Sequence, residues 1–249
     1  MFTRVETAGR RSGSNLPKGP PARGYHCLLI DGPGNGQVLR RHGLAFRPDW
    51  EAFITPVVDY LLTRDEVDPE GIMLMGLSMG GFLAPRAAAK EHRLRICIAN
   101  PGVLDWGEVF FNQLKGYSPM MLSLYNKDKE RLNRVLDTAG KLSPFLLWGL
   151  TDTMWKHGAD TPSEMLDKML EFENREGAAR ITAATLVIDA EEEEYGQSRL
   201  LYDALTSRKD FMVFTDAEAA PLHVQTGSLA IMSQRVFDWI DRELGRPGF

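Results

Sequence analysis

Residues 72–82 read Ile-Met-Leu-Met-Gly-Leu-Ser-Met-Gly-Gly-Phe, an apolar run that is interrupted at Gly76-Leu77-Ser78-Met79-Gly80. These five residues fit the G-x-S-x-G pattern, in which a strand delivers a serine to a sharp turn and a helix follows directly. Such a turn strains the serine backbone and leaves little space, so small residues are needed two positions before and after it. An ordinary tight strand-to-helix turn is the alternative interpretation. The flanking strand and helix patterns favour Ser78 as a nucleophile, with the N–H of Met79 as an oxyanion donor.

A base for this serine is expected further along the chain. A serine hydroxyl is a weak nucleophile near neutral pH, so it needs a base, and the base needs an orienting acid. When a serine lies on such a turn, the acid and then the histidine follow on loops after later strands. Only His223 follows the last predicted strand, whereas His26 falls within a strand and His42, His92 and His157 precede the expected acid. We therefore predict His223 as the base.

The acid is expected after the strand predicted at residues 186–188. The chain there reads Asp189-Ala190-Glu191-Glu192-Glu193-Glu194-Tyr195. Most of such a run must be solvated, because adjacent carboxylates cannot all be desolvated cheaply. A single carboxylate turned inward to the imidazole would complete a triad. We predict Glu193 for this role, with Glu192 and Asp189 as alternatives.

Bulk composition excludes several classes of protein. The chain has 249 residues and a net charge of -5 with interspersed signs, which does not suit a nucleic-acid-binding surface. No apolar stretch is long enough for a membrane span. Cys27 and Cys97 lie in apolar strand-like segments and are predicted to be buried thiols of a reduced, cytoplasmic protein. We expect a small-molecule substrate as the partner, neither nucleic acid nor membrane, and allow for a homodimer.

The order of elements predicts an α/β fold with a mostly parallel sheet and helices on both faces. Residues 1–23 are predicted to be a poorly ordered arm, and a buried strand is expected at residues 25–30. Residues 24–104 and 181–249 alternate strand and helix patterns and form the predicted core. Residues 105–180 are mainly helical and rich in large apolar side chains. Their position between two strands downstream of Ser78 predicts a cap over the carboxyl ends of the strands, with extra helical core as the alternative.

Two other binding functions are rejected. Gly32-Pro33-Gly34-Asn35-Gly36 resembles a dinucleotide-binding loop, but the fingerprint requires glycine at position 37, where this chain has Gln37. The histidines and cysteines do not have the spacing of metal ligands. We therefore expect neither a cofactor nor a metal.

Several motifs together resemble one branch of the α/β-hydrolases. They are residues 31–36 (Asp-Gly-Pro-Gly-Asn-Gly), 46–51 (Phe-Arg-Pro-Asp-Trp-Glu), 56–60 (Pro-Val-Val-Asp-Tyr), 76–81 (Gly-Leu-Ser-Met-Gly-Gly) with 84–88 (Ala-Pro-Arg-Ala-Ala), 223–225 (His-Val-Gln) and 234–240 (Gln-Arg-Val-Phe-Asp-Trp-Ile). This branch is similar to 2,6-dihydroxypseudooxynicotine hydrolase and to the fungal hydrolases that shorten polyketide chains. The resemblance covers residues 24–244 and is strongest before residue 102.

The resemblance implies a chemistry and assigns roles by position. Ser78 matches the nucleophile, His223 the base, and Glu193 the position of the family's aspartate; glutamate is the third member in some α/β-hydrolases. It implies attack on a carbonyl group and cleavage of a carbon–carbon bond next to a ketone in a bulky or aromatic substrate. A carboxylic-ester hydrolase with the same triad is the alternative.

The N-terminal part departs from the family pattern. The fold normally has a strand and Gly-rich loop upstream that supply the second oxyanion-hole N–H. Only the predicted arm precedes residues 25–30 here, so the N-terminal strands are expected to be missing or reduced. Either glycines of residues 31–36 replace the missing donor, or the chain is a catalytically impaired scaffold that binds without turnover.

Overall fold

The computed structural model describes residues 2–4 and 23–246, which form two compact units. The first unit comprises the described residues up to Ile30, then Asp49–Leu104, and the described residues from Asn174 onward. The second unit comprises Asp31–Pro48 and Asp105–Glu173.

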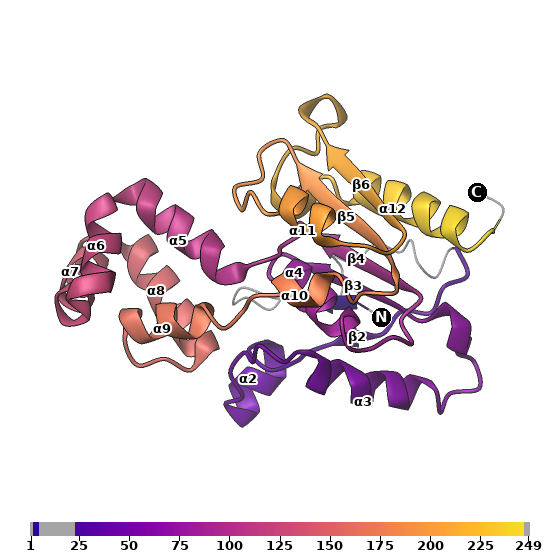
Figure 1. The fold of residues 1–249 in the computed structure, drawn as a ribbon, viewed down its shortest axis with the longest axis horizontal. Coiled ribbons are helices and arrows are strands. Elements are labelled where there is room, and N and C mark those ends of the chain that lie inside the picture. Colours follow the sequence, from indigo (N-terminus) through magenta and orange to yellow (C-terminus); the bar gives the residue numbers. More distant parts are fainter. Residues whose placement is uncertain (1, 5–22, 247–249) are drawn as a thin grey trace. The chain divides into compact units, whose positions relative to one another are not determined.

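The first unit is built on a six-stranded sheet with the order β2-β1-β3-β4-β5-β6 (Figure 1). Every neighbouring pair of strands in it is parallel. Parallel neighbours require crossover connections, and these connections place helices on the faces of the sheet. The strands are β1 (Phe2–Arg4), β2 (Leu29–Ile30), β3 (Met73–Leu77), β4 (Ile96–Asn100), β5 (Ala184–Ala190) and β6 (Lys209–Phe214).

Side-chain alternation along β3 assigns the two faces of this sheet. Met75 belongs to a core cluster with residues of the last helix, among them Phe237 and Ile240. Gly76 points to the opposite face, because a Cβ built on it would meet the carbonyl oxygen of Gly80 at 1.8 Å, at the start of the next helix. The helices of this unit are α3 (Glu51–Leu61), α4 (Gly80–Ala88), α10 (Arg175–Ala178), α11 (Ser198–Ala204) and α12 (Leu229–Glu243).

The second unit is helical among its described residues, and its helix starts follow local sequence signals. Asp105, Asp128, Ser143 and Thr161 each accept a backbone N–H at the start of a helix, which satisfies one of the donors left free there. The helix that precedes Gly158 ends at this glycine, which adopts the left-handed conformation with φ of 63°. The helices are α2 (Gly36–His42), α5 (Trp106–Tyr117), α6 (Pro119–Lys127), α7 (Lys129–Leu142), α8 (Pro144–His157) and α9 (Pro162–Met169).

The N-terminal part corrects several expectations from the sequence. The arm predicted at residues 1–23 falls mostly outside the described residues, but residues 2–4 form β1, between β2 and β3. A central strand is therefore present and reduced in length, not missing. The strand expected at residues 25–30 shrinks to Leu29–Ile30, and Cys27 is exposed, whereas Cys97 is buried in β4 as predicted.

The unit boundaries also differ from the predicted domains. Residues 31–48 fall within the core predicted from the alternation of strands and helices, but they group with the helical second unit. Residues 174–180 were assigned to the cap but group with the sheet. The sequence pattern does not reveal these boundaries, because the second unit consists of two segments that are separate in the sequence. Its role as a cap remains a prediction.

No helix in the described part of the chain is long and apolar enough to cross a membrane.

The close approach between β3 and α4 yields a first prediction. Gly76→Ala would drive a methyl group into the backbone of Gly80, which cannot move without distorting the turn. We expect a loss of about 2–3 kcal/mol in the free energy of unfolding, measured by urea denaturation. Gly149→Ala, in α8 with nothing within 4 Å of the added carbon, is the control and should be neutral or mildly stabilising. Equal stability of the two variants would contradict the packing described.

Candidate active site

Ser78 lies on a strained turn at the carboxyl end of β3. Its backbone φ is 58°, in the left-handed region that non-glycine residues rarely occupy. The turn is fixed from both sides: the N–H of Ser78 donates to the carbonyl of Asn100 at the end of β4, at 2.7 Å. On the other side, a Cβ on Gly81 would meet the carbonyl oxygen of Pro101 at 1.8 Å. The surrounding backbone therefore maintains the strain and holds the serine at the edge of the sheet.

The start of α4 presents backbone donors beside this serine. Gly81 and Phe82 donate their N–H groups to the carbonyls of Ser78 and Met79, at 2.7 and 3.0 Å. The N–H groups of Met79 and Gly80 precede these bonds, at the helix end whose first donors have no intrahelical acceptor. The positive end of the helix dipole adds to their field. The predicted donor Met79 is thus placed where an anion beside Ser78 would be stabilised.

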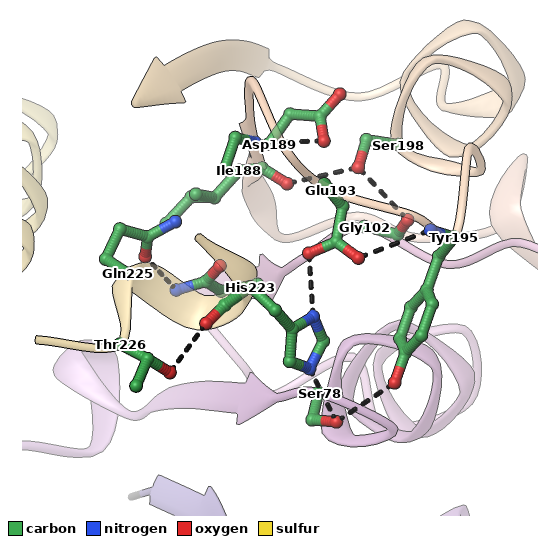
Figure 2. A network of polar contacts seen from close by, with 12 residues as sticks. Ser78, Gly102, Ile188, Asp189, Glu193, Tyr195, Ser198, His223, Gln225 and Thr226 are labelled. Carbon is green, nitrogen blue, oxygen red and sulfur yellow. Dashed lines mark hydrogen bonds and ion pairs between the residues drawn. The ribbon is translucent and has the colours of Figure 1, made fainter. Parts of the chain in front are cut away.

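His223 contacts Ser78 from the loop after β6. Its Nε2 lies 3.0 Å from the Ser78 Oγ, and its Nδ1 lies 2.7 Å from Glu193 Oε2 (Figure 2). Its side chain is 37% exposed, so the ring has access to solvent. Because Glu193 is an acceptor, Nδ1 carries the proton and Nε2 accepts from the serine hydroxyl.

A buried amide pair anchors the His223 loop to the sheet. The Nδ2 of Asn100 donates to Oε1 of Gln225 at 2.8 Å, and both side chains are fully buried. Gln225 itself has φ of 51°, and Val224 has φ of 49°. The amide–amide bond connects this strained turn, and with it the histidine loop, to the strand that also fixes Ser78.

In the acidic run of residues 189–194, one carboxylate points inward and several point outward. The side chain of Glu193 is 3% exposed and contacts His223, as the sequence analysis predicted for the acid. Glu192 is exposed, and its backbone N–H donates to the carbonyl of Pro221 at 2.9 Å, which ties the acid loop to the histidine loop. Asp189 is half-buried and accepts the N–H of Ala190, and burial raises the pKa of its carboxyl. The structure therefore brings Ser78, His223 and Glu193 together and leaves the two alternatives apart from the imidazole.

Tyr195 also contacts the serine, although no pattern in the sequence predicts this. Its hydroxyl lies 3.3 Å from the Ser78 Oγ, and its ring centroid lies 4.8 Å from that of His223 (Figure 2). Burial raises the pKa of this phenol to about 12, with the charges of Glu193 and Glu194 adding to the effect. The only signal in the sequence was its place two residues after the predicted acid, which does not say where a side chain points.

Other candidate donors and ligands are not placed at this site. The fold takes its second oxyanion donor from the loop after the strand in the position of β1. In this chain those residues, from Val5 onward, lie outside the described range, and residues 31–36 belong to the second unit. Within residues 2–4 and 23–246, no group of three or more His, Cys, Asp or Glu could hold a metal ion.

Comparison with known sequences identifies the family. Residues 14–231 match the model of the alpha/beta hydrolase family, and the chain belongs to that family. Its curated relatives include the hydrolase acrC of Aspergillus aculeatus, 29% identical over 240 residues, covering 90% of this chain and 56% of the relative. Another is the 20-hydroxy-prefusarin hydrolase FUS2 of Gibberella moniliformis, 28% identical over 234 residues, covering 88% of this chain and 55% of the relative. The chain thus spans about half the length of these fungal hydrolases.

Solved structures agree with this fold. The crystal structure of the 2,6-dihydroxy-pseudo-oxynicotine hydrolase aligns with a TM-score of 0.59 and 18% identity, covering 87% of this chain and 52% of that chain. An acetyl xylan esterase from Paenibacillus sp. R4 aligns with a TM-score of 0.61 and 16% identity, covering 96% of this chain and 72% of that chain. The branch recognised from the sequence motifs is confirmed by these relatives.

The amide pair beneath the site yields a second prediction. Gln225→Met keeps the length of the side chain but leaves the buried Nδ2 of Asn100 without its acceptor. We expect the free energy of unfolding in urea to fall by about 1–3 kcal/mol. Thr226→Val removes an exposed hydroxyl that donates to the carbonyl of His223, and should cost about 1 kcal/mol or less. An unchanged stability of Gln225→Met would show that this pair does not hold the loop.

Proposed function

We propose that the protein is a serine-dependent hydrolase that acts through an acyl-enzyme, with Ser78, His223 and Glu193 as its triad. The observation that carries this proposal is the continuous pair of contacts from Ser78 Oγ to His223 Nε2 at 3.0 Å and from His223 Nδ1 to Glu193 Oε2 at 2.7 Å. A nucleophile, a base and an orienting acid in this order define the triad by geometry, whatever their spacing in the sequence.

The chemistry follows from these contacts. His223 removes the proton of Ser78 as the serine oxygen attacks a carbonyl carbon, while Glu193 holds the ring and stabilises its positive charge. The N–H of Met79 stabilises the negative oxygen that forms. The bond to the leaving group then breaks, and the leaving group takes the proton from His223. Water activated by His223 releases the acyl group and restores the free serine.

We propose a substrate with a carbon–carbon bond next to a ketone, in a bulky or aromatic molecule. Support comes from the family branch and from relatives whose names refer to 2,6-dihydroxy-pseudo-oxynicotine and 20-hydroxy-prefusarin as substrates. An ester substrate needs the same triad and is the alternative, favoured by the fold's likeness to an acetyl xylan esterase. Comparing the hydrolysis of a 1,3-diketone with that of an aryl ester of the same acyl group separates the two.

A binding scaffold without turnover is the competing proposal. That proposal rests on the expected loss of a central strand, but β1 occupies the position of this strand in the sheet. A scaffold should neither react at Ser78 nor hydrolyse an ester, whereas a hydrolase should do both.

The third prediction tests the nucleophile and the base. We expect a fluorophosphonate probe to add once to the wild-type protein, as measured by intact mass. Ser78→Ala and His223→Ala should each lose the adduct, because the first removes the attacking oxygen and the second removes its base. Turnover of a p-nitrophenyl ester should fall at least 10³-fold in both, roughly the loss typical of triad members.

Exposed residues of the same types provide controls for this experiment. Ser123→Ala and His92→Ala should keep the adduct and the ester activity, since both side chains lie on the surface. Equal ester hydrolysis by the wild type and Ser78→Ala would contradict the mechanism. A folded wild type without an adduct would favour the scaffold.

The fourth prediction separates Glu193 from its neighbours. Glu193→Gln keeps the size of the side chain but removes the charge that faces His223, so kcat should fall by roughly 10²–10⁴-fold. Glu192→Gln makes the same chemical change on an exposed side chain and should stay within about twofold of wild type. Steady-state kinetics with the p-nitrophenyl ester measure both. A loss in Glu192→Gln that matches or exceeds that in Glu193→Gln would refute the assignment.

A further inference from the structure

We propose that Tyr195 is a further catalytic residue, whose phenolic O–H donates first to the Ser78 oxygen and then to the oxyanion on the attacked carbon. This inference rests on the proposed serine mechanism and adds to it a side-chain donor from the acid loop. The observation behind it is the 3.3 Å distance between the Tyr195 hydroxyl and the Ser78 Oγ.

The direction of this hydrogen bond follows from counting protons. The Ser78 hydroxyl has one proton, and the contact with His223 Nε2 at 3.0 Å uses it. The neutral imidazole that acts as a base has a single N–H, and it faces Glu193 from Nδ1 at 2.7 Å, so Nε2 is an acceptor. The Ser78 oxygen can therefore only accept from Tyr195, and the phenol is the donor.

The phenol remains a donor throughout the working range of such an enzyme. Burial and the nearby carboxylates of Glu193 and Glu194 raise its pKa to about 12, because each of them disfavours a phenolate. Tyr195 thus stabilises charge by donating a hydrogen bond, and its proton stays on the phenol oxygen throughout.

The backbone and the ring hold this hydroxyl in place. The N–H of Tyr195 lies 3.3 Å from Oε1 of Glu193, the oxygen that does not contact His223. The ring packs against the imidazole at a centroid distance of 4.8 Å and an interplanar angle of 59°. The same carboxylate therefore orients both the base and the loop that carries the phenol, so the donor is preorganised when the substrate arrives.

The reaction brings the oxyanion within reach of this donor. Once the Ser78 oxygen bonds to the carbonyl carbon, the former carbonyl oxygen is attached to the same carbon and lies beside the Ser78 Oγ. The distance of 3.3 Å is long for an O–H···O bond, and such bonds commonly tighten only in the transition-state complex. In the proposed step the phenol transfers its hydrogen bond from the Ser78 oxygen to this neighbouring oxygen.

The fifth prediction is made for Tyr195→Phe, which keeps the ring against His223 and removes only the hydroxyl. Stopped-flow kinetics with p-nitrophenyl acetate give separate rate constants for acylation and deacylation. Both steps pass through an oxyanion on the same carbon, so both rate constants should fall by a similar factor, roughly 10–10²-fold, with KM within about twofold. Tyr202→Phe removes a phenol whose ring packs on Phe211, and should change neither rate constant.

Each other pattern of rates overturns the proposal. A loss confined to acylation would mean that Tyr195 only orients the free Ser78 hydroxyl, because that hydroxyl no longer exists in the acyl-enzyme. Unchanged rate constants would mean that the hydroxyl has no part in the reaction. A drop in thermal stability together with a loss of fluorophosphonate labelling would indicate a structural role.

A second measurement separates this proposal from the proposed function. A trifluoromethyl ketone adds to a reactive serine to give a stable oxyanion, so its inhibition constant should rise in Tyr195→Phe by the same factor as the rates fall. If wild type reacts at Ser78 but the inhibition constant is unchanged in Tyr195→Phe, only the inference on Tyr195 fails. If wild type itself forms no adduct with the fluorophosphonate probe or the ketone, the serine mechanism fails, and the inference fails with it.

Discussion

The close contact between the backbones of β3 and α4 is the constraint on which the rest of the site depends. Gly76 has no space for a side chain because the carbonyl of Gly80 fills it, and Gly81 has none because Pro101 lies against it. These contacts force the chain through a left-handed turn at Ser78, with φ of 58°. The serine oxygen is thereby exposed at the end of the strand, and the first N–H groups of α4 lie beside it.

Parallel pairing brings the remaining groups to the same edge of the sheet. The carboxyl ends of β3, β4, β5 and β6 lie together: Asn100 ends β4, and the segments after β3, β5 and β6 carry Ser78, Glu193 and His223. Hydrogen bonds fix the separations between these segments: the N–H of Gly102 donates to the carbonyl of Ile188 at 3.0 Å, and Asn100 Nδ2 donates to Gln225 Oε1 at 2.8 Å. Because hydrogen bonds join these segments, we expect a change in one of them to shift the position of the His223 imidazole.

The acid loop does more than supply a carboxylate. The side chain of Glu193 is buried and contacts His223. The exposed Glu191 accepts the backbone N–H of Asp216 and so connects the acid loop to the segment after β6. The same loop then carries Tyr195 back to the serine. One carboxylate of the acidic run thus makes a buried contact. Burial is the main cause that keeps the phenol of Tyr195 protonated, and the charges of Glu193 and Glu194 add to it.

The sequence by itself determined the parts of this protein that rest on local patterns. The G-x-S-x-G pattern predicts the turn, and at Gly76 only glycine fits because the carbonyl of Gly80 fills the space of a side chain. Short apolar runs predict β3 to β6, and apolar residues at helical spacing predict α12. The order of elements predicts His223 and an acid within residues 189–194, since parallel strands deliver their loops to one edge, and the family resemblance places that acid at Glu193.

Only the tertiary structure decided the remaining features, because each depends on contacts between distant segments. A three-residue strand such as β1 has no periodicity to read, and its neighbours in the sheet define it. Residues 31–48 join the helical unit through packing that their motifs do not encode. The position of Tyr195 beside Ser78 depends on the path of one loop, because a sequence gives the order of side chains but not the direction in which a turn points them.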